Sequence, residues 1–123
     1  MAGSWPKDEG FGVMTCRCWH SGASFRQFSH FRSVGVDETE GRYADVWVQE
    51  CRECHLLWLR YAVEYEGFSK SGRWARRHIG QPDAETITPE RAVGHVENGS
   101  YVYGGSYFDG ASGWRKTPMR WGL

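Results

Sequence analysis

The fold of this 123-residue chain is decided by residues 43–66, which read YADVWVQECRECHLLWLRYAVEYE. Over residues 43–49, two valines share one side of an extended chain and a tryptophan takes the other, as in a half-buried strand. Over residues 57–65, apolar residues alternate with mostly charged ones, which is the period of a second strand. We therefore predict an antiparallel hairpin whose tight turn is the Cys-x-x-Cys knuckle formed by Cys51 and Cys54.

The four cysteines of the chain form two close pairs, Cys16-x-Cys18 and Cys51-x-x-Cys54. Two thiolates one or two residues apart can reach one ion, so two such pairs can close a tetrahedral site. A site with four thiolates leaves no open position for water or substrate, and we therefore predict structural Zn²⁺ rather than catalytic metal. Unliganded buried thiols, or a disulfide or redox pair, remain alternatives from the spacing alone.

Two histidines lie next to these pairs and could replace a cysteine as ligand. His20 lies two residues after Cys18, and His55 directly follows Cys54. We expect His55 to point out of the turn and at most to contact a metal-binding residue without binding the metal itself. A mixed site with His20 in place of Cys18 is the main variant.

The knuckle and its flanking strands resemble the zinc-ribbon class, over about residues 14–66. This resemblance implies two knuckles at the tips of β-hairpins that clamp one zinc ion. Cys16-Arg17-Cys18 departs from the usual two-residue spacing. Rubredoxins, which hold iron on similar knuckles, use the two-residue spacing at both turns, so iron electron transfer ranks below zinc. Ribbons serve transcription, translation and protein interaction alike, and the class does not decide the function.

The sequence predicts an α+β, mainly β, fold with one short helix. Thr88-Pro89-Glu90 is typical of a helix start and indicates a helix over about 89–97. The other elements we expect are a short helix or irregular aromatic segment over 24–33, a polar turn around 35–41, a third strand over 73–79, a last strand over 101–108 interrupted by glycines, and flexible ends over 1–12 and 110–123.

Composition limits the possible functions. The length indicates a single zinc-stabilised domain over 1–123. With 15 basic and 15 acidic residues the net charge is zero, so no global field favours nucleic acid or an anionic membrane. The sequence shows no signal peptide and no membrane span, and we expect a cytoplasmic protein, where thiols stay reduced. Seven tryptophans and six tyrosines suit strands and interfaces.

We expect a small protein-recognition module, in which exposed aromatic residues bind another protein; this class includes inhibitors and immunity-type proteins. The alternative is a nucleic-acid-binding zinc-ribbon protein with a basic aromatic patch over residues 70–78. A solvated strand edge would give the same pattern. The candidate binding residues for either partner are Lys70, Arg73, Trp74, Arg76 and Arg77.

Enzymatic activity is the least favoured class. Glu64 and Glu66 could form a carboxylate pair, but such a row is more often a cross-strand charge ladder. The glycines at 104–105 could approach a phosphate, yet no P-loop lysine completes that motif. We therefore predict no catalytic residue.

Overall fold

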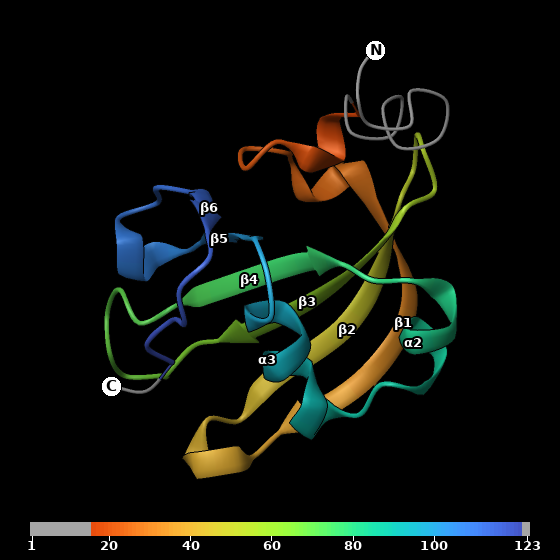
Figure 1. Ribbon diagram of the computed structural model, residues 1–123. Coiled ribbons are helices and arrows are strands. Elements are labelled where there is room, and N and C mark those ends of the chain that lie inside the picture. Colours follow the sequence, from red (N-terminus) through yellow and green to blue (C-terminus); the bar gives the residue numbers. More distant parts are fainter. Residues whose placement is uncertain (1–15, 122–123) are drawn as a thin grey trace.

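The computed structural model describes residues 16–121 as a curved antiparallel sheet with two helices on one face (Figure 1). The six strands follow one another in chain order across the sheet, from β1 to β6. This arrangement confirms the predicted α+β, mainly β, fold class. The elements are β1 (Phe28–Asp37), β2 (Ala44–Cys51), β3 (Leu57–Val63), β4 (Arg73–His78), α2 (Gln81–Thr86), α3 (Pro89–Glu97), β5 (Tyr101–Gly104) and β6 (Gly113–Arg115), with short 3₁₀ turns η2 (Arg17–Trp19), η3 (Phe25–Gln27), η4 (Thr39–Gly41) and η5 (Ser106–Phe108).

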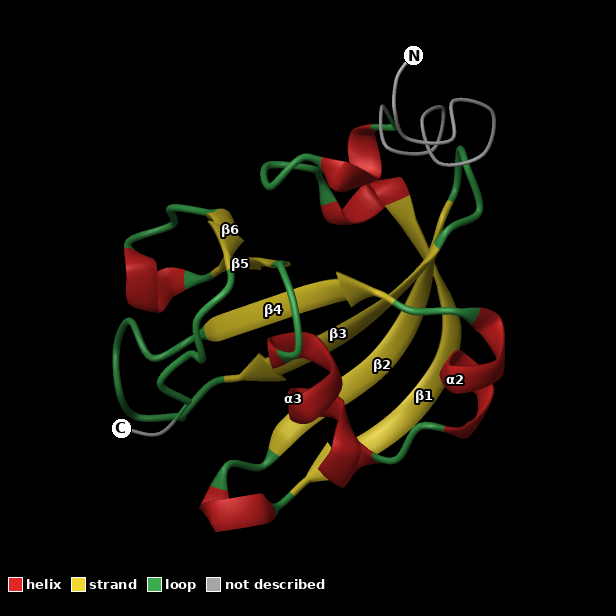
Figure 2. Cartoon of the chain, viewed as in Figure 1, coloured by secondary structure: helices red, strands yellow, loops and turns green. Residues whose placement is uncertain are grey.

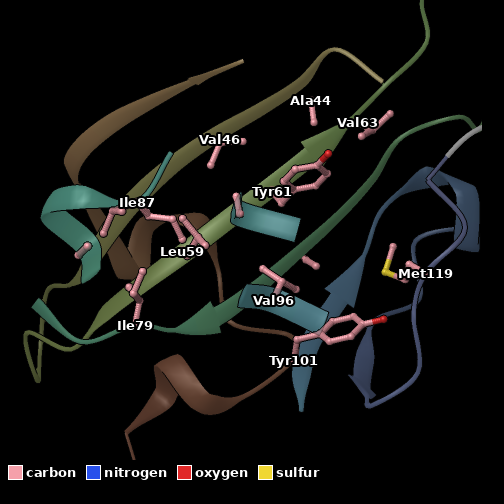
Figure 3. Close-up of a cluster of buried hydrophobic side chains, with 14 of the residues drawn as sticks. Ala44, Val46, Leu59, Tyr61, Val63, Ile79, Ile87, Val96, Tyr101 and Met119 are labelled. Carbon is pink, nitrogen blue, oxygen red and sulfur yellow. The ribbon is translucent and has the colours of Figure 1, made fainter. Parts of the chain in front are cut away.

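The predicted hairpin is confirmed. Strands β2 and β3 pair in a register that places Val46 opposite Tyr61 and Val48 opposite Leu59. Directly opposite residues of an antiparallel pair lie on the same face, so all four side chains enter one core. That core lies between the sheet and the helices, where Val46, Leu59 and Tyr61 lie with Val96 of α3 (Figure 3).

The two helices follow β4 and cover the face of the sheet that holds this core (Figure 2). Helix α3 begins at Pro89 and ends at Glu97, as predicted from the sequence. Helix α2 was not predicted, because six residues are too few to show a helical period. Arg32 of β1 stabilises its carboxyl end, since the guanidinium donates to the carbonyl oxygens of Ala84 and Ile87.

Strand β1 corrects the prediction of a helix or irregular segment over residues 28–33, whereas residues 25–27 form the short 3₁₀ turn η3. Phe28 and Phe31, three residues apart, pack on opposite faces of this strand, and its register against β2 shifts, as at β-bulges, between His30 and Arg32 and between Ser33 and Gly35. Each bulge adds a residue to one strand, so Phe31 and Val34 both pack on the core. The predicted polar turn is shorter than expected, since β1 extends to Asp37.

The carboxyl-terminal segment also differs from the prediction. Residues 113–115 pair with β5 as strand β6, and Met119 and Trp121 are buried in the core, so residues 113–121 are not the flexible tail that we expected. The predicted last strand ends at Gly104, and a 3₁₀ turn follows it. The predicted flexible segment over 1–12 lies outside the described residues. Within residues 16–121, every helix is too short and too polar to cross a bilayer.

A second, smaller cluster lies on the opposite face of the sheet. Cys18, Phe28, Cys51 and Trp58 are buried there beneath the chain that leads into β1. Trp58 belongs to this cluster although its neighbours Leu57 and Leu59 belong to the first, because side chains alternate between faces along a strand. The cysteines therefore lie apart from the core that the helices cover.

Candidate metal centre

The structure brings the four cysteine sulfur atoms together, all within 4.8 Å of one another. The Sγ atoms of Cys16 and Cys51 are 3.5 Å apart, and those of Cys18 and Cys54 are 3.6 Å apart. Zinc–sulfur bonds of about 2.3 Å in a tetrahedron separate the sulfur atoms by roughly 3.8 Å. Both the donor atoms and their spacing fit a metal ion, and the four cysteines can hold one.

Local backbone structure positions each sulfur. Cys51 is the last residue of β2, and the chain turns back to β3 with the His55 amide donating to the Cys51 carbonyl. The amides of Glu53 and Cys54 point at the Cys51 sulfur, at 3.4 and 3.5 Å. The Gln27 side chain adds a third donor at 3.3 Å. These contacts are those that a negatively charged sulfur accepts, and they orient it inward.

The pKa values of the cysteines show that the four sulfur atoms affect one another. Burial acts to raise the pKa of Cys51, but the hydrogen bonds from Cys54, Gln27 and Glu53 lower it to about 6. Burial raises the pKa of Cys54 to about 11 and, with the neighbouring sulfurs, raises that of Cys18 well above its usual range. Four thiolates this close would repel one another, so a cation between them would favour the deprotonated form of all four.

Neither His20 nor His55 replaces a cysteine in the sulfur cluster. His20 is exposed, and the ring of His55 is directed to Glu50, with 2.8 Å between Nδ1 and Oε2. The expectation that His55 points out of the turn is therefore confirmed. His55 has a φ of 65°, a left-handed backbone conformation that favours glycine.

The first cysteine pair differs from a ribbon knuckle. Cys16 precedes η2 and Cys18 lies within it, so this chelating pair sits on a 3₁₀ turn. The zinc-ribbon resemblance implies a hairpin tip at both pairs, whereas in the described residues only Cys51 and Cys54 lie at one. The identity of the fold as a zinc ribbon stays a prediction.

The predicted basic aromatic residues do not form one exposed patch. Arg73 and Arg76 are buried, and they lie on opposite faces of β4. The Arg76 guanidinium donates to the carbonyl oxygens of Cys18 and His20. Strand β4 lies between β3 and β5, so it is not the strand edge that the charges also suggested. These arginines stabilise backbone carbonyls, and no phosphate contact can be assigned to them from this placement.

The remaining predicted binding residues are separated as well. Arg77 extends toward α3, where it donates to the His95 carbonyl oxygen. Lys70 is exposed and forms an ion pair with Asp109 at 2.8 Å. Trp74 lies half-buried against Gly104 on the face opposite the helices.

Trp74 belongs to a feature that the sequence did not reveal, an aromatic–arginine face made of Trp47, Arg60 and Trp74. The Arg60 guanidinium carbon lies 4.4 Å from the Trp74 ring centre and 5.5 Å from that of Trp47. Among the described ion pairs none involves Arg60, and its Nε lacks an acceptor. Only the strand register, which places Trp47 opposite Arg60, shows this grouping.

Comparison with known proteins adds no relative. No family model, curated protein or solved structure matches this chain. Any functional assignment must therefore come from the metal centre and from the surfaces around it.

Proposed function

We propose that this chain is a structural zinc protein that recognises another protein through the aromatic–arginine face. The cysteine cluster supports zinc, because four sulfur donors at tetrahedral spacing match its preferred ligands and leave no position for a substrate. In this proposal the metal fixes the chain between η2 and the β2–β3 turn, and the face beside it contacts the partner.

The observation that carries the proposal is that Arg60 is charged and largely buried without a carboxylate partner in the described residues. Burial lowers the pKa of Arg60 to about 10, so the side chain remains charged at neutral pH in a partly desolvated site. It lies directly opposite Arg76, which adds repulsion rather than a counter-charge. A charged arginine between two tryptophan rings, without a carboxylate partner in the described residues, has the composition of an interface hot spot.

The chemistry of the partner follows from that state. A carboxylate placed on Arg60 would form a charge-assisted hydrogen bond, and flat apolar groups would pack on Trp47 and Trp74. We therefore infer an acidic protein surface with an aromatic or aliphatic anchor. An inhibitor or immunity-type protein would act in this way, by covering the surface of its partner.

The test uses immobilised wild-type protein and three variants. Arg60→Glu and Trp74→Ala should each lose a captured partner, and a hot-spot residue should cost about 2 kcal/mol or more in calorimetry with that partner purified. Arg91→Glu is the matched control, because Arg91 is an exposed arginine on α3, on the other face of the sheet. Capture that is equal for wild type and Arg60→Glu would reject this face as the binding surface.

Nucleic-acid binding remains the alternative prediction, and its salt dependence separates the two functions. Contacts to phosphates release counterions, so affinity for single-stranded RNA or DNA should fall steeply between low and moderate salt. With Arg73 and Arg76 buried, we expect no such binding through the predicted basic residues of β4. If salt-dependent binding is found and Arg60→Glu weakens it, the partner of the aromatic–arginine face is nucleic acid and not a protein.

A further inference from the structure

A cavity of about 560 Å³ lies beside the metal centre, where the η2 turn approaches strands β4 and β6. In Figure 1, the η2 segment and β6 lie on either side of this end of the sheet. The volume is in the range of small-molecule sites, roughly 300–1,000 Å³. We call this cavity the tryptophan pocket; its lining residues are Trp19, Trp58, Arg77, His78, Ser100 and Trp114.

The tryptophan rings give the pocket flat walls. The rings of Trp19 and Trp114 are within 13° of parallel, with centres 6.0 Å apart. Trp58 meets Trp19 edge-on, at 71° and 4.9 Å. Trp114 remains 44% exposed although it stands on a paired strand. Flat apolar walls with one accessible ring favour a planar aromatic ligand, which gains stacking contacts on them.

The charge of the pocket lining favours an anionic ligand. Arg77 supplies the positive charge; only one of its five N–H donors is used by the His95 carbonyl.

The titratable neighbours do not cancel this charge. Burial lowers the pKa of His78, and the charges of His95 and Arg77 lower it further, so the imidazole is neutral at pH 7. Among the described residues that line the pocket, none is acidic. Arg77 is therefore the charged group that a ligand meets.

We propose that the tryptophan pocket binds a planar heteroaromatic anion of the nucleoside monophosphate class, with the ring on the tryptophans and the phosphate on Arg77. This site is separate from the aromatic–arginine face and does not depend on the proposed protein partner. Because Trp19 follows the metal ligand Cys18 directly, the metal centre holds one wall of the pocket in place.

Isothermal titration calorimetry with AMP tests the proposal, with adenosine and inorganic phosphate as partial ligands. AMP should bind at one site per chain, adenosine more weakly, and phosphate not detectably. Trp114→Ala should weaken AMP binding about tenfold, since loss of one stacking surface costs about 1.4 kcal/mol. Arg77→Gln should weaken AMP binding and leave adenosine binding unchanged.

The control is Trp47→Ala, the same chemical change outside the pocket, which should leave AMP affinity unchanged. Equal affinity for AMP and adenosine, or AMP binding that Trp114→Ala does not weaken, would overturn the proposal. A short deoxyadenosine oligonucleotide compared with AMP identifies the source of the nucleotide. If the oligonucleotide binds more tightly than AMP, and Trp114→Ala and Arg77→Gln both abolish this binding, the pocket recognises the nucleotide as part of a single strand.

Discussion

In the zinc protein proposed above, removal of the metal should unfold residues 16–27 while leaving the sheet and helices folded. The reason is that the metal centre belongs to the small cluster of Cys18, Phe28, Cys51 and Trp58, whereas the larger core lies on the other face of the sheet. A chelator, or the variant Cys54→Ser, applies the perturbation.

The magnitude follows from the contacts of this segment. Holding about twelve residues in one conformation costs about 12–24 kcal/mol in backbone entropy. The two Arg76 hydrogen bonds to Cys18 and His20 return about 3–6 kcal/mol, and the half-buried Trp19 about 2 kcal/mol. Structural zinc contributes about 10–16 kcal/mol in small peptides, which makes up the difference. Without it, the remaining contacts are too weak to order the segment.

Hydrogen exchange before and after chelation measures this unfolding. Elemental analysis of the untreated protein should find about one zinc per chain. Protection should disappear over 16–27 and around the β2–β3 turn, and persist in β2 and β3. His55→Ala is the control, because this exposed side chain adjoins the ligand Cys54 without binding the metal. Unchanged protection over 16–27, bound iron in place of zinc, or simultaneous loss of the whole sheet would refute the reasoning.

Three further outcomes concern stability. Tyr61→Phe should cost about 1–3 kcal/mol in urea unfolding, because it removes the donor to the buried Asp37 carboxylate; an unchanged midpoint would contradict that role. Burial acts to raise the pKa of Asp37, but hydrogen bonds from Thr39 and Tyr61 and the Arg42 charge bring it below 3.8. The free energy of unfolding should therefore fall as pH drops below about 4. Asp37→Asn should flatten this pH dependence in urea titrations. His55→Gly should raise the melting temperature, since glycine relieves a left-handed conformation worth about 1 kcal/mol and the lost contact to Glu50 is exposed; a lower melting temperature would show that this contact matters more.

Features set by local chemistry could be predicted from the sequence. The β2–β3 hairpin was predicted because a period of two and a chelating turn are properties of adjacent residues. Helix α3 was predicted because proline is common at the first helical position: it lacks the backbone N–H that would have no partner within the helix there. The four cysteines were predicted as one cluster because each pair can already chelate alone.

Features set by pairing between distant segments could not be predicted. The spacing of Phe28 and Phe31 is also that of a helix, and only pairing with β2 makes this segment a strand. The arginines of β4 read as a surface patch, yet Arg73 and Arg76 are buried because carbonyl oxygens of distant segments accept from them.

The candidate binding surfaces show the same division. Sequence alone determined the residue types, a chain rich in tryptophan and arginine with four cysteines in two close pairs. The strand register brought Trp47 beside Arg60, and the packing of η2 against β6 brought Trp19 beside Trp114. Such groupings depend on how segments far apart in the chain pair, and no local pattern records that pairing.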